Sequence, residues 1–129
     1  MSYQIKNNKI IFKDIKKIGF EELNDISDNI SEVVLPDGLE VILEDAFFDK
    51  TNLKKINIPN TVREIQSQSF WGLDNLKEIV LFPTIEKIDK NAFCNCVNLT
   101  IKVMCNKNNL PKSWNNECFS NIKELKFMK

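Results

Sequence analysis

The chain has 129 residues, 43% of them hydrophobic and 28% charged, which suits one domain with a buried core. Lys plus Arg and Asp plus Glu both number 18, so the cationic footprint that general nucleic-acid or anionic-membrane binding needs is missing. No apolar run reaches about 18 residues, so no transmembrane helix is expected.

The N-terminal segment is predicted to be a cap. Strand-like residues at 3–6 and 10–12 flank Asn7 and Asn8, a pair that favours a hairpin turn. Residues 15–23 resemble half of a degraded repeat, so we assign residues 1–29 to the cap. The segment lacks the apolar centre of a secretory signal. We therefore expect a cytoplasmic protein, or a surface or secreted one whose signal has been removed.

Residues 30–104 repeat with a period of 23. Asparagines and phenylalanines both keep this spacing, at Asn29, Asn52, Asn75 and Asn98 and at Phe47, Phe70 and Phe93. A fixed period in the range of roughly 20–50 residues is typical of stacked structural units. We predict a mainly β solenoid with one coil per period.

Each repeat contains a strand, a turn and a return segment. In the second repeat, Ile56 and Ile58 alternate with polar residues, as in a strand with one buried face. Pro59 then ends the strand, because proline cannot donate to a ladder. On the way back, Val62 and Ile65 are predicted to point inward, followed by a buried Phe70 that stacks on its equivalents in the neighbouring coils.

The asparagine column is predicted to form a ladder. A side-chain amide carries two donors and an acceptor, so stacked asparagines could satisfy turn groups above and below, inside the coil. The alternative is four solvated turn asparagines, because this residue favours turns in any case.

The repeat resembles the bacterial-surface-protein-A type of leucine-rich repeat, also called the treponemal type. Ile56, Ile58, Pro59 and Val62 match its pattern, as do Ala92, Phe93, Cys96 and Leu99. Cys96 takes the core cysteine position of that family, with Leu73 one unit earlier and Lys50 before that. Because lysine does not fit the family pattern at this core position, either the first unit is looser there or only the lysine stem is buried. The resemblance implies a right-handed solenoid with a concave parallel sheet and a protein-binding role, with no catalytic residue to transfer.

The 23-residue period ends near the C-terminus. A slip by one residue places Ile101 and Val103 where Ile79 and Leu81 lie one coil earlier. We assign residues 105–129 to an irregular cap with Trp114 as a capping residue, because terminal repeats must cover an unpartnered coil. The basic cluster Lys123, Lys126 and Lys129 is interpreted as a frayed, solvated tail. The whole chain, 1–129, is then one leucine-rich-repeat domain.

The cysteines Cys94, Cys96, Cys105 and Cys118 have gaps of 2, 9 and 13 residues. A four-thiolate zinc site needs two close pairs, and only one pair here is close. Core or surface thiols are favoured over a disulfide, and no metal or other cofactor is expected. The chain has no histidine to serve as a general base and no glycine-rich phosphate loop, so we predict that it is not an enzyme.

Two outward-facing columns are candidates for partner binding. Phe48 and Trp71 each follow an inward phenylalanine and should form an apolar strip on one flank. Alternatively, the loop of the next coil covers them. Val34, Asn57 and Val80 should face the concavity of the sheet, where ordinary strand propensity is the favoured explanation and a partner-binding face is the alternative. Glu32, Lys55 and Glu78 form an alternating column beside them that is expected to pair across strands.

We interpret the chain as a non-enzymatic protein-protein interaction module, as a monomer or weak homodimer. One alternative is an inhibitor encoded by a phage or mobile element, similar to an anti-CRISPR protein, that occludes the surface of a host enzyme. Another is a structural homodimer sealed by the flank aromatics.

Overall fold

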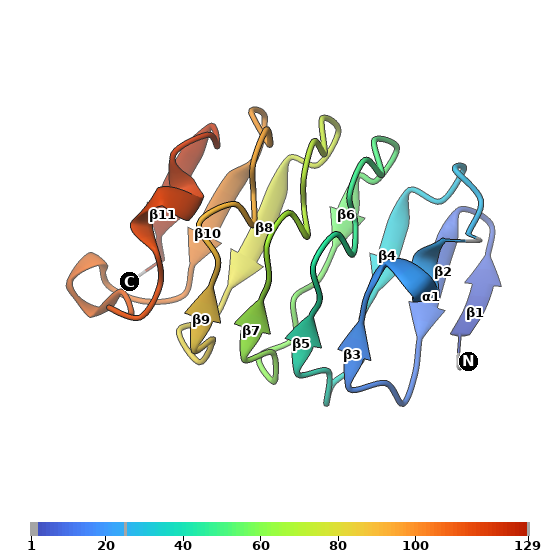
Figure 1. Cartoon of the computed structure of the whole chain (residues 1–129), viewed down its shortest axis with the longest axis horizontal. Coiled ribbons are helices and arrows are strands. Elements are labelled where there is room, and N and C mark those ends of the chain that lie inside the picture. The colour runs from blue at the N-terminus through green and yellow to red at the C-terminus, as the bar shows by residue number, and fades with distance from the viewer. Residues whose placement is uncertain (1–2, 25, 129) are drawn as a thin grey trace.

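The computed structural model describes residues 3–24 and 26–128. The chain winds into a right-handed solenoid in which each coil lies beside the one before it (Figure 1). The elements in chain order are β1 (Tyr3–Lys6), β2 (Lys9–Phe12), β3 (Lys17–Ile18), α1 (Phe20–Leu23), β4 (Glu32–Val34), β5 (Val41–Ile42), β6 (Lys55–Ile56), β7 (Glu64–Ile65), β8 (Glu78–Leu81), β9 (Lys87–Ile88), β10 (Thr100–Val103), the 3-10 helices η1 (Lys107–Asn109) and η2 (Asn116–Phe119), and β11 (Glu124–Phe127).

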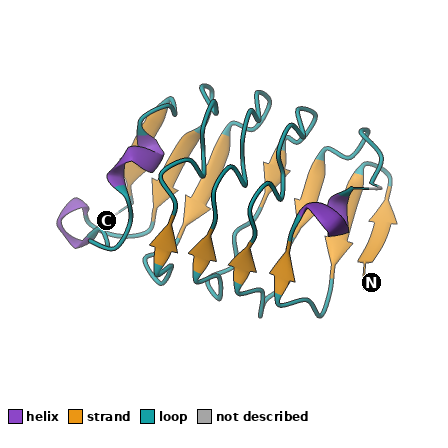
Figure 2. Ribbon diagram, in the orientation of Figure 1, coloured by secondary structure: helices purple, strands orange, loops and turns teal. Residues whose placement is uncertain are grey.

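Every coil has three faces. The long sheet runs through β1, β2, β4 and β6 and continues, after an interruption, through β8, β10 and β11. The short sheet is made of the two-residue strands β3, β5, β7 and β9, which lie in front in Figure 1. Loops and turns fill the rest of each coil and form the third face, which we call the turn face (Figure 2).

The register follows the sequence period. In the short sheet Val41 pairs with Glu64, and Glu64 pairs with Lys87, each one 23-residue step away. In the long sheet Ile101 pairs with Ile79 and Val103 with Leu81, a step of 22. The predicted slip by one residue is therefore confirmed.

The turn face is held by an alternating hydrogen-bond pattern. The amide of Phe47 donates to the carbonyl of Ser69 in the next coil at 2.7 Å, and that of Phe70 to Ala92 at 2.9 Å. The residue after each of these donates within its own coil, as Phe48 does to Asp45 at 3.2 Å. Asp49, Gly72 and Asn95 end this run with φ of 61°, 69° and 61°. Glycine, asparagine and aspartate tolerate this left-handed conformation best, so the column suits its residues.

A stack of phenylalanine rings forms the centre of the core. The Phe47 and Phe70 ring centroids lie 5.2 Å apart at 16°, and those of Phe70 and Phe93 lie 5.3 Å apart at 14°. All three side chains are fully buried. Ala46, Ser69 and Ala92 precede them and are also buried, because only a small side chain fits between the stack and the next coil. The predicted ring stack is confirmed.

The asparagine ladder exists, but it lies on the surface. The side-chain amides of Asn52, Asn75 and Asn98 donate to the carbonyls of Asp28, Thr51 and Asp74 in the preceding coil, at 2.6, 2.6 and 3.1 Å. All three side chains are exposed. The prediction that they lie inside the coil is wrong, since the turn carbonyls they bind are themselves at the surface.

The two ends differ in regularity. β1 and β2 form the predicted antiparallel hairpin, with Asn7 at φ 54° in the turn. At the other end the Trp114 indole N–H donates to the carbonyl of Ile85 at 2.7 Å, and its side chain is buried as a cap. The C-terminal residues are not a frayed tail. Residues 124–127 pair in parallel with β10, because Leu125 and Phe127 pack against the core; Lys129 lies outside the described residues.

Candidate functional site

Phe48 and Trp71 form an aromatic pair on the outside of the solenoid, which we call the aromatic flank. Their ring centroids lie 5.7 Å apart at an interplanar angle of 12°, so the rings are stacked. Phe48 is 39% exposed and Trp71 is half-buried. They face outward because the residue after each inward phenylalanine points away from the core. Cys94, one coil further on, is also half-buried.

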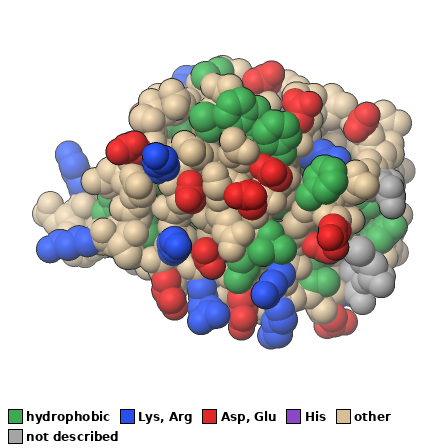
Figure 3. Space-filling model, viewed as in Figure 1, with side chains coloured by type: hydrophobic (Ala, Val, Ile, Leu, Met, Phe, Trp, Pro, Cys, Tyr) green, Lys and Arg blue, Asp and Glu red, His purple; other side chains and the backbone are tan. Residues whose placement is uncertain are grey.

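The surface around the aromatic flank is mixed in character. Figure 3 shows hydrophobic side chains gathering in the upper part of the view, over the loops above β5, β7 and β9, with acidic side chains around them. Exposed acidic residues of the same segments include Glu44, Asp49 and Asp74. An apolar centre with a polar rim is the usual composition of a protein-binding patch.

The second predicted face, on the long sheet, is less open than expected. Val34 and Val80 are half-buried, and Asn57 is exposed. The Asn57 amide is already engaged: its Oδ1 accepts from the Leu35 amide at 2.7 Å, and its Nδ2 donates to the Leu35 carbonyl at 2.9 Å. This side chain replaces a rung of the strand ladder. The structure does not bring this face together with the aromatic flank, because the two lie on different faces of the coil.

The charged column on the long sheet pairs only in part. The Lys55 ammonium lies 4.0 Å from the Glu32 carboxylate, as expected. Glu78 pairs instead with Lys102 at 3.0 Å, on the side away from Lys55. Exposed pairs of this kind contribute little to stability, about 0.2–1 kcal/mol each.

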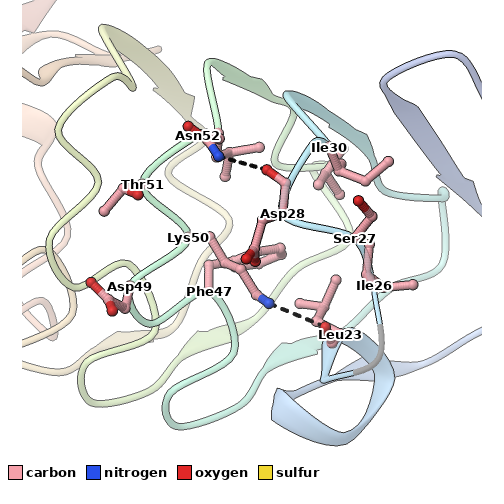
Figure 4. A pocket seen from close by; sticks show the side chains of 12 residues that line it. Leu23, Ile26, Ser27, Asp28, Ile30, Phe47, Asp49, Lys50, Thr51 and Asn52 are labelled. Atoms are coloured by element: carbon pink, nitrogen blue, oxygen red, sulfur yellow. Dashed lines mark hydrogen bonds between the residues drawn. The ribbon is translucent and has the colours of Figure 1, made fainter.

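A pocket of about 260 Å³ opens beside Lys50. Leu23, Ile26 and Phe47 lie on its apolar side, and Asp28 and Asn52 on its polar side (Figure 4). The Lys50 ammonium donates to the Leu23 carbonyl at 3.2 Å across it. Lys50 is half-buried beside this pocket, so this interior position is filled less completely than in the next unit, where Leu73 is fully buried.

Burial keeps two of the four thiols protonated. All four cysteines are free, and Cys96 and Cys118 are buried. Burial raises the pKa of the Cys96 thiol to about 11 and that of Cys118 to about 12, so both stay protonated near neutral pH. Across residues 3–24 and 26–128, no three His, Cys, Asp or Glu side chains are grouped to hold a metal ion. The helices in this part of the chain are too short or too polar to cross a bilayer.

Sequence reasoning missed two features of these surfaces. One is the bidentate Asn57 contact with Leu35. The other is the left-handed column Asp49, Gly72 and Asn95, whose 23-residue spacing and residue types could have revealed it.

Comparison with known proteins finds the same type of leucine-rich repeat that the sequence predicts. Residues 3–129 match the family described as the BspA type leucine rich repeat region, in six copies. Among solved structures, the pneumococcal vaccine antigen PcpA is similar at 16% identity and a TM-score of 0.52, covering 95% of this chain and 42% of that one. A leucine-rich repeat protein from Bacteroides ovatus is similar at 16% identity and a TM-score of 0.53, covering 97% of this chain and 39% of that one. At this identity the likeness concerns the fold. The chain spans about two-fifths of the length of both structures. The comparison with curated protein sequences gives no match.

Proposed function

We propose that this chain, which belongs to the BspA type leucine-rich repeat family of protein-interaction modules, binds a protein partner through the aromatic flank. The observation that carries the proposal is the stacked, outward-facing pair of Phe48 and Trp71. Members of this family generally act as non-enzymatic modules. The cytoplasmic location and the domain boundaries of the cap and repeat segments stay predictions.

Leaving these two rings partly in water costs free energy. Two stacked aromatic side chains that remain partly exposed keep apolar area available for burial against a partner. Stacking also fixes their orientation before binding, so less side-chain entropy is lost when a partner arrives. The turn-face hydrogen bonds at Phe47 and Phe70 hold the backbone below them, and the pair is therefore a rigid anchor.

The test compares affinity capture from lysate of the source organism by the wild type and by Phe48→Ser and Trp71→Ser variants. Phe20→Ser is the matched control, because Phe20 is 53% exposed and lies in α1, outside the flank. After the partner is identified by mass spectrometry, isothermal titration measures its Kd for each variant. We expect each flank substitution to weaken binding by about tenfold or more, as for interface anchors.

Folding is checked first by circular dichroism and thermal melting, since Trp71 is half-buried. Binding of a folded double variant within twofold of the wild type would contradict the proposal. Sedimentation of the isolated protein tests the homodimer alternative. An association that disappears in Phe48→Ser would assign the flank to a second copy of the chain.

A further inference from the structure

The two ends of the long sheet are strands that pair on one side only. Figure 1 shows β1 and β11 at opposite ends of the solenoid. Within residues 3–24 and 26–128, β1 pairs only with β2, and β11 pairs only with β10. Each end strand therefore keeps a row of backbone N–H and C=O groups on its outer edge, which is the property that lets another strand add to a sheet.

The N-terminal end strand also leaves apolar side chains uncovered. Across the hairpin Tyr3 pairs with Phe12, which is buried, and the next pair on the same face joins Ile5 to the buried Ile10. Because paired residues share one face of a sheet, Tyr3 and Ile5 lie on the core-facing side. As far as the structure describes the chain, the short sheet begins with β3, in the coil of β2, so no strand of it lies under β1. Tyr3 is therefore 44% exposed and Ile5 47% exposed.

The C-terminal end strand shows the same alternation of side chains. Leu125 and Phe127 pack against the core and are half-buried. Glu124 and Lys126 alternate with them on the opposite side of the strand and are exposed. The Lys126 ammonium lies 3.9 Å from the Glu124 carboxylate. Both end strands thus place apolar residues on the core-facing side and polar residues on the outer side.

In β1 the unused backbone groups belong to Tyr3 and Ile5. Lys6 and Lys9 flank the two-residue turn of the hairpin, a position that forms a hydrogen-bonded pair. In an antiparallel pair, hydrogen-bonded residues alternate with residues whose backbone groups point to the other side. The N–H and C=O groups of Ile5 and Tyr3 therefore point away from β2, toward the outer edge.

In β11 the unused backbone groups belong to Leu125 and Phe127. The Glu124 amide donates to the carbonyl just before β10 at 3.4 Å, and the Met128 amide donates to the last carbonyl of β10 at 3.0 Å. Because the backbone groups of successive strand residues point to opposite sides, those of Leu125 and Phe127 point to the outer edge.

One antiparallel register satisfies the backbone of both edges. With Ile5 opposite Leu125, the outward N–H and C=O groups of each residue meet those of the other. Two residues along, Tyr3 then lies opposite Phe127 in the same relation. All four apolar side chains fall on the core-facing side, so pairing the edges also reduces their exposed area.

The charges select the same register. It places Lys6 opposite Glu124, a pair of opposite charges, and both side chains are exposed on the outer side. A shift by two residues in one direction would place Lys6 opposite Lys126, and like charges directly opposite are unfavourable. A shift by two in the other direction takes Lys6 beyond the start of β11.

We propose that the β1 edge of one molecule binds the β11 edge of a second copy of this chain in this antiparallel register. The long sheet then continues from one molecule into the next. The contact is heterologous and leaves one free edge at each end, so it builds short open chains and not a closed dimer. Four residues on each side make a small interface, and the association is therefore weak and depends on concentration. It goes beyond the proposed function, because it uses the two ends of the solenoid and not the aromatic flank.

The experiment measures the weight-average sedimentation coefficient of the whole chain at low salt over a range of concentrations. We expect it to rise steadily, without the plateau of a dimer. Lys6→Glu and Glu124→Lys should each lower the association constant about fivefold, because each places like charges opposite one another at every contact. Lys90→Glu is the matched control: this exposed lysine belongs to neither end strand, and its reversal should change the association constant less than twofold. Circular dichroism checks that each variant is folded.

An equimolar mixture of Lys6→Glu and Glu124→Lys tests the register directly. In the mixture each molecule meets a partner of opposite charge at both ends, so the association constant should return to within about twofold of the wild-type value. A mixture that stays as weak as the single variants overturns the proposal.

Three other outcomes also overturn it. A wild type that stays monomeric up to its solubility limit shows that the edges do not pair. A loss in Lys6→Glu without a loss in Glu124→Lys assigns the contact to two β1 edges. An association that disappears in Phe48→Ser belongs to the aromatic flank, whereas end-to-end pairing should be unchanged in that variant.

Discussion

Lys50 and Cys96 occupy equivalent places in the repeat, two periods apart, but the interior around them is filled differently. Cys96 and the intermediate Leu73 are fully buried. Lys50 is half-buried and borders a pocket of about 260 Å³. The period therefore determines where a side chain points, whereas the residue type determines how much of the interior it fills.

The neighbours explain this difference. Cys96 packs against a complete preceding coil, and its thiol donates to the Phe70 carbonyl. Lys50 faces α1 and the segment after it, where Leu23 and Ile26 replace the regular coil. A charged head group cannot be buried there without a partner, so it reaches across the pocket to the Leu23 carbonyl.

The largest expected change in the free energy of unfolding tests whether the phenylalanine stack packs less tightly at Phe47, beside Lys50, than at Phe70. Phe70 is stacked on both sides, whereas Phe47 is stacked on Phe70 alone and also lines the pocket. Phe70→Ala should lower the free energy of unfolding by about 3–5 kcal/mol. Phe47→Ala should cost less, near the lower end of that range, because fewer contacts are lost.

Chemical denaturation followed by circular dichroism measures both variants. Phe20→Ala is the control, since its exposed ring should contribute less than about 0.5 kcal/mol. Equal losses for Phe47→Ala and Phe70→Ala would show that the pocket does not loosen the stack.

Much of the fold could be predicted because the apolar positions repeat. The spacing of Phe47, Phe70 and Phe93 gives the stack, and the one-residue shift at Ile101 gives the slip in the last parallel pairing. The end of the chain was predicted less well. Leu125 and Phe127 alternate as in a strand, but the lysines between and around them suggested a solvated tail. What decides the outcome is the open edge of β10, which a single-sequence pattern does not reveal.

The candidate site was predictable in part. Alternation after an inward phenylalanine correctly indicates that Phe48 and Trp71 point outward, although their binding role stays a prediction. Asn57 looked like an exposed surface residue, and its bond to Leu35 depends on the distance between two strands. The break in strand pairing between β6 and β8 was not expected either, since residues 54–58 and 77–81 fit the same repeat pattern.

A smaller change in the free energy of unfolding should appear at alkaline pH, because of the buried thiols of Cys96 and Cys118. Burial raises the pKa of Cys96 to about 11 and that of Cys118 to about 12, from an ordinary value of 9.0. The folded state therefore keeps protons that the unfolded state loses. This contribution to stability is fully present below about pH 9 and is lost as the pH rises toward 11–12.

Between about pH 8 and pH 10, the two thiols together should lower the free energy of unfolding by about 2–3 kcal/mol. Urea denaturation at a series of pH values measures the slope. Cys96→Leu, which copies Leu73, should roughly halve that slope, because one of the two titrating thiols is gone. An unchanged slope would mean that other groups cause the alkaline destabilisation.

The smallest expected change in the free energy of unfolding comes from giving position 50 the apolar residue type that the later coils have there. Lys50→Leu places the residue of the next coil beside Leu23, Ile26 and Phe47 and should raise the free energy of unfolding by about 1 kcal/mol. Burial of the added apolar group must exceed the loss of one partly exposed hydrogen bond to the Leu23 carbonyl, which contributes a similar or smaller amount. Lys50→Met is the matched control, because it keeps a long flexible stem and removes only the ammonium group. If thermal denaturation shows that Leu destabilises while Met is neutral, the pocket is too irregular for a branched side chain. If both destabilise, the bond to Leu23 matters more than the empty volume, and the N-terminal coil is held by its lysine.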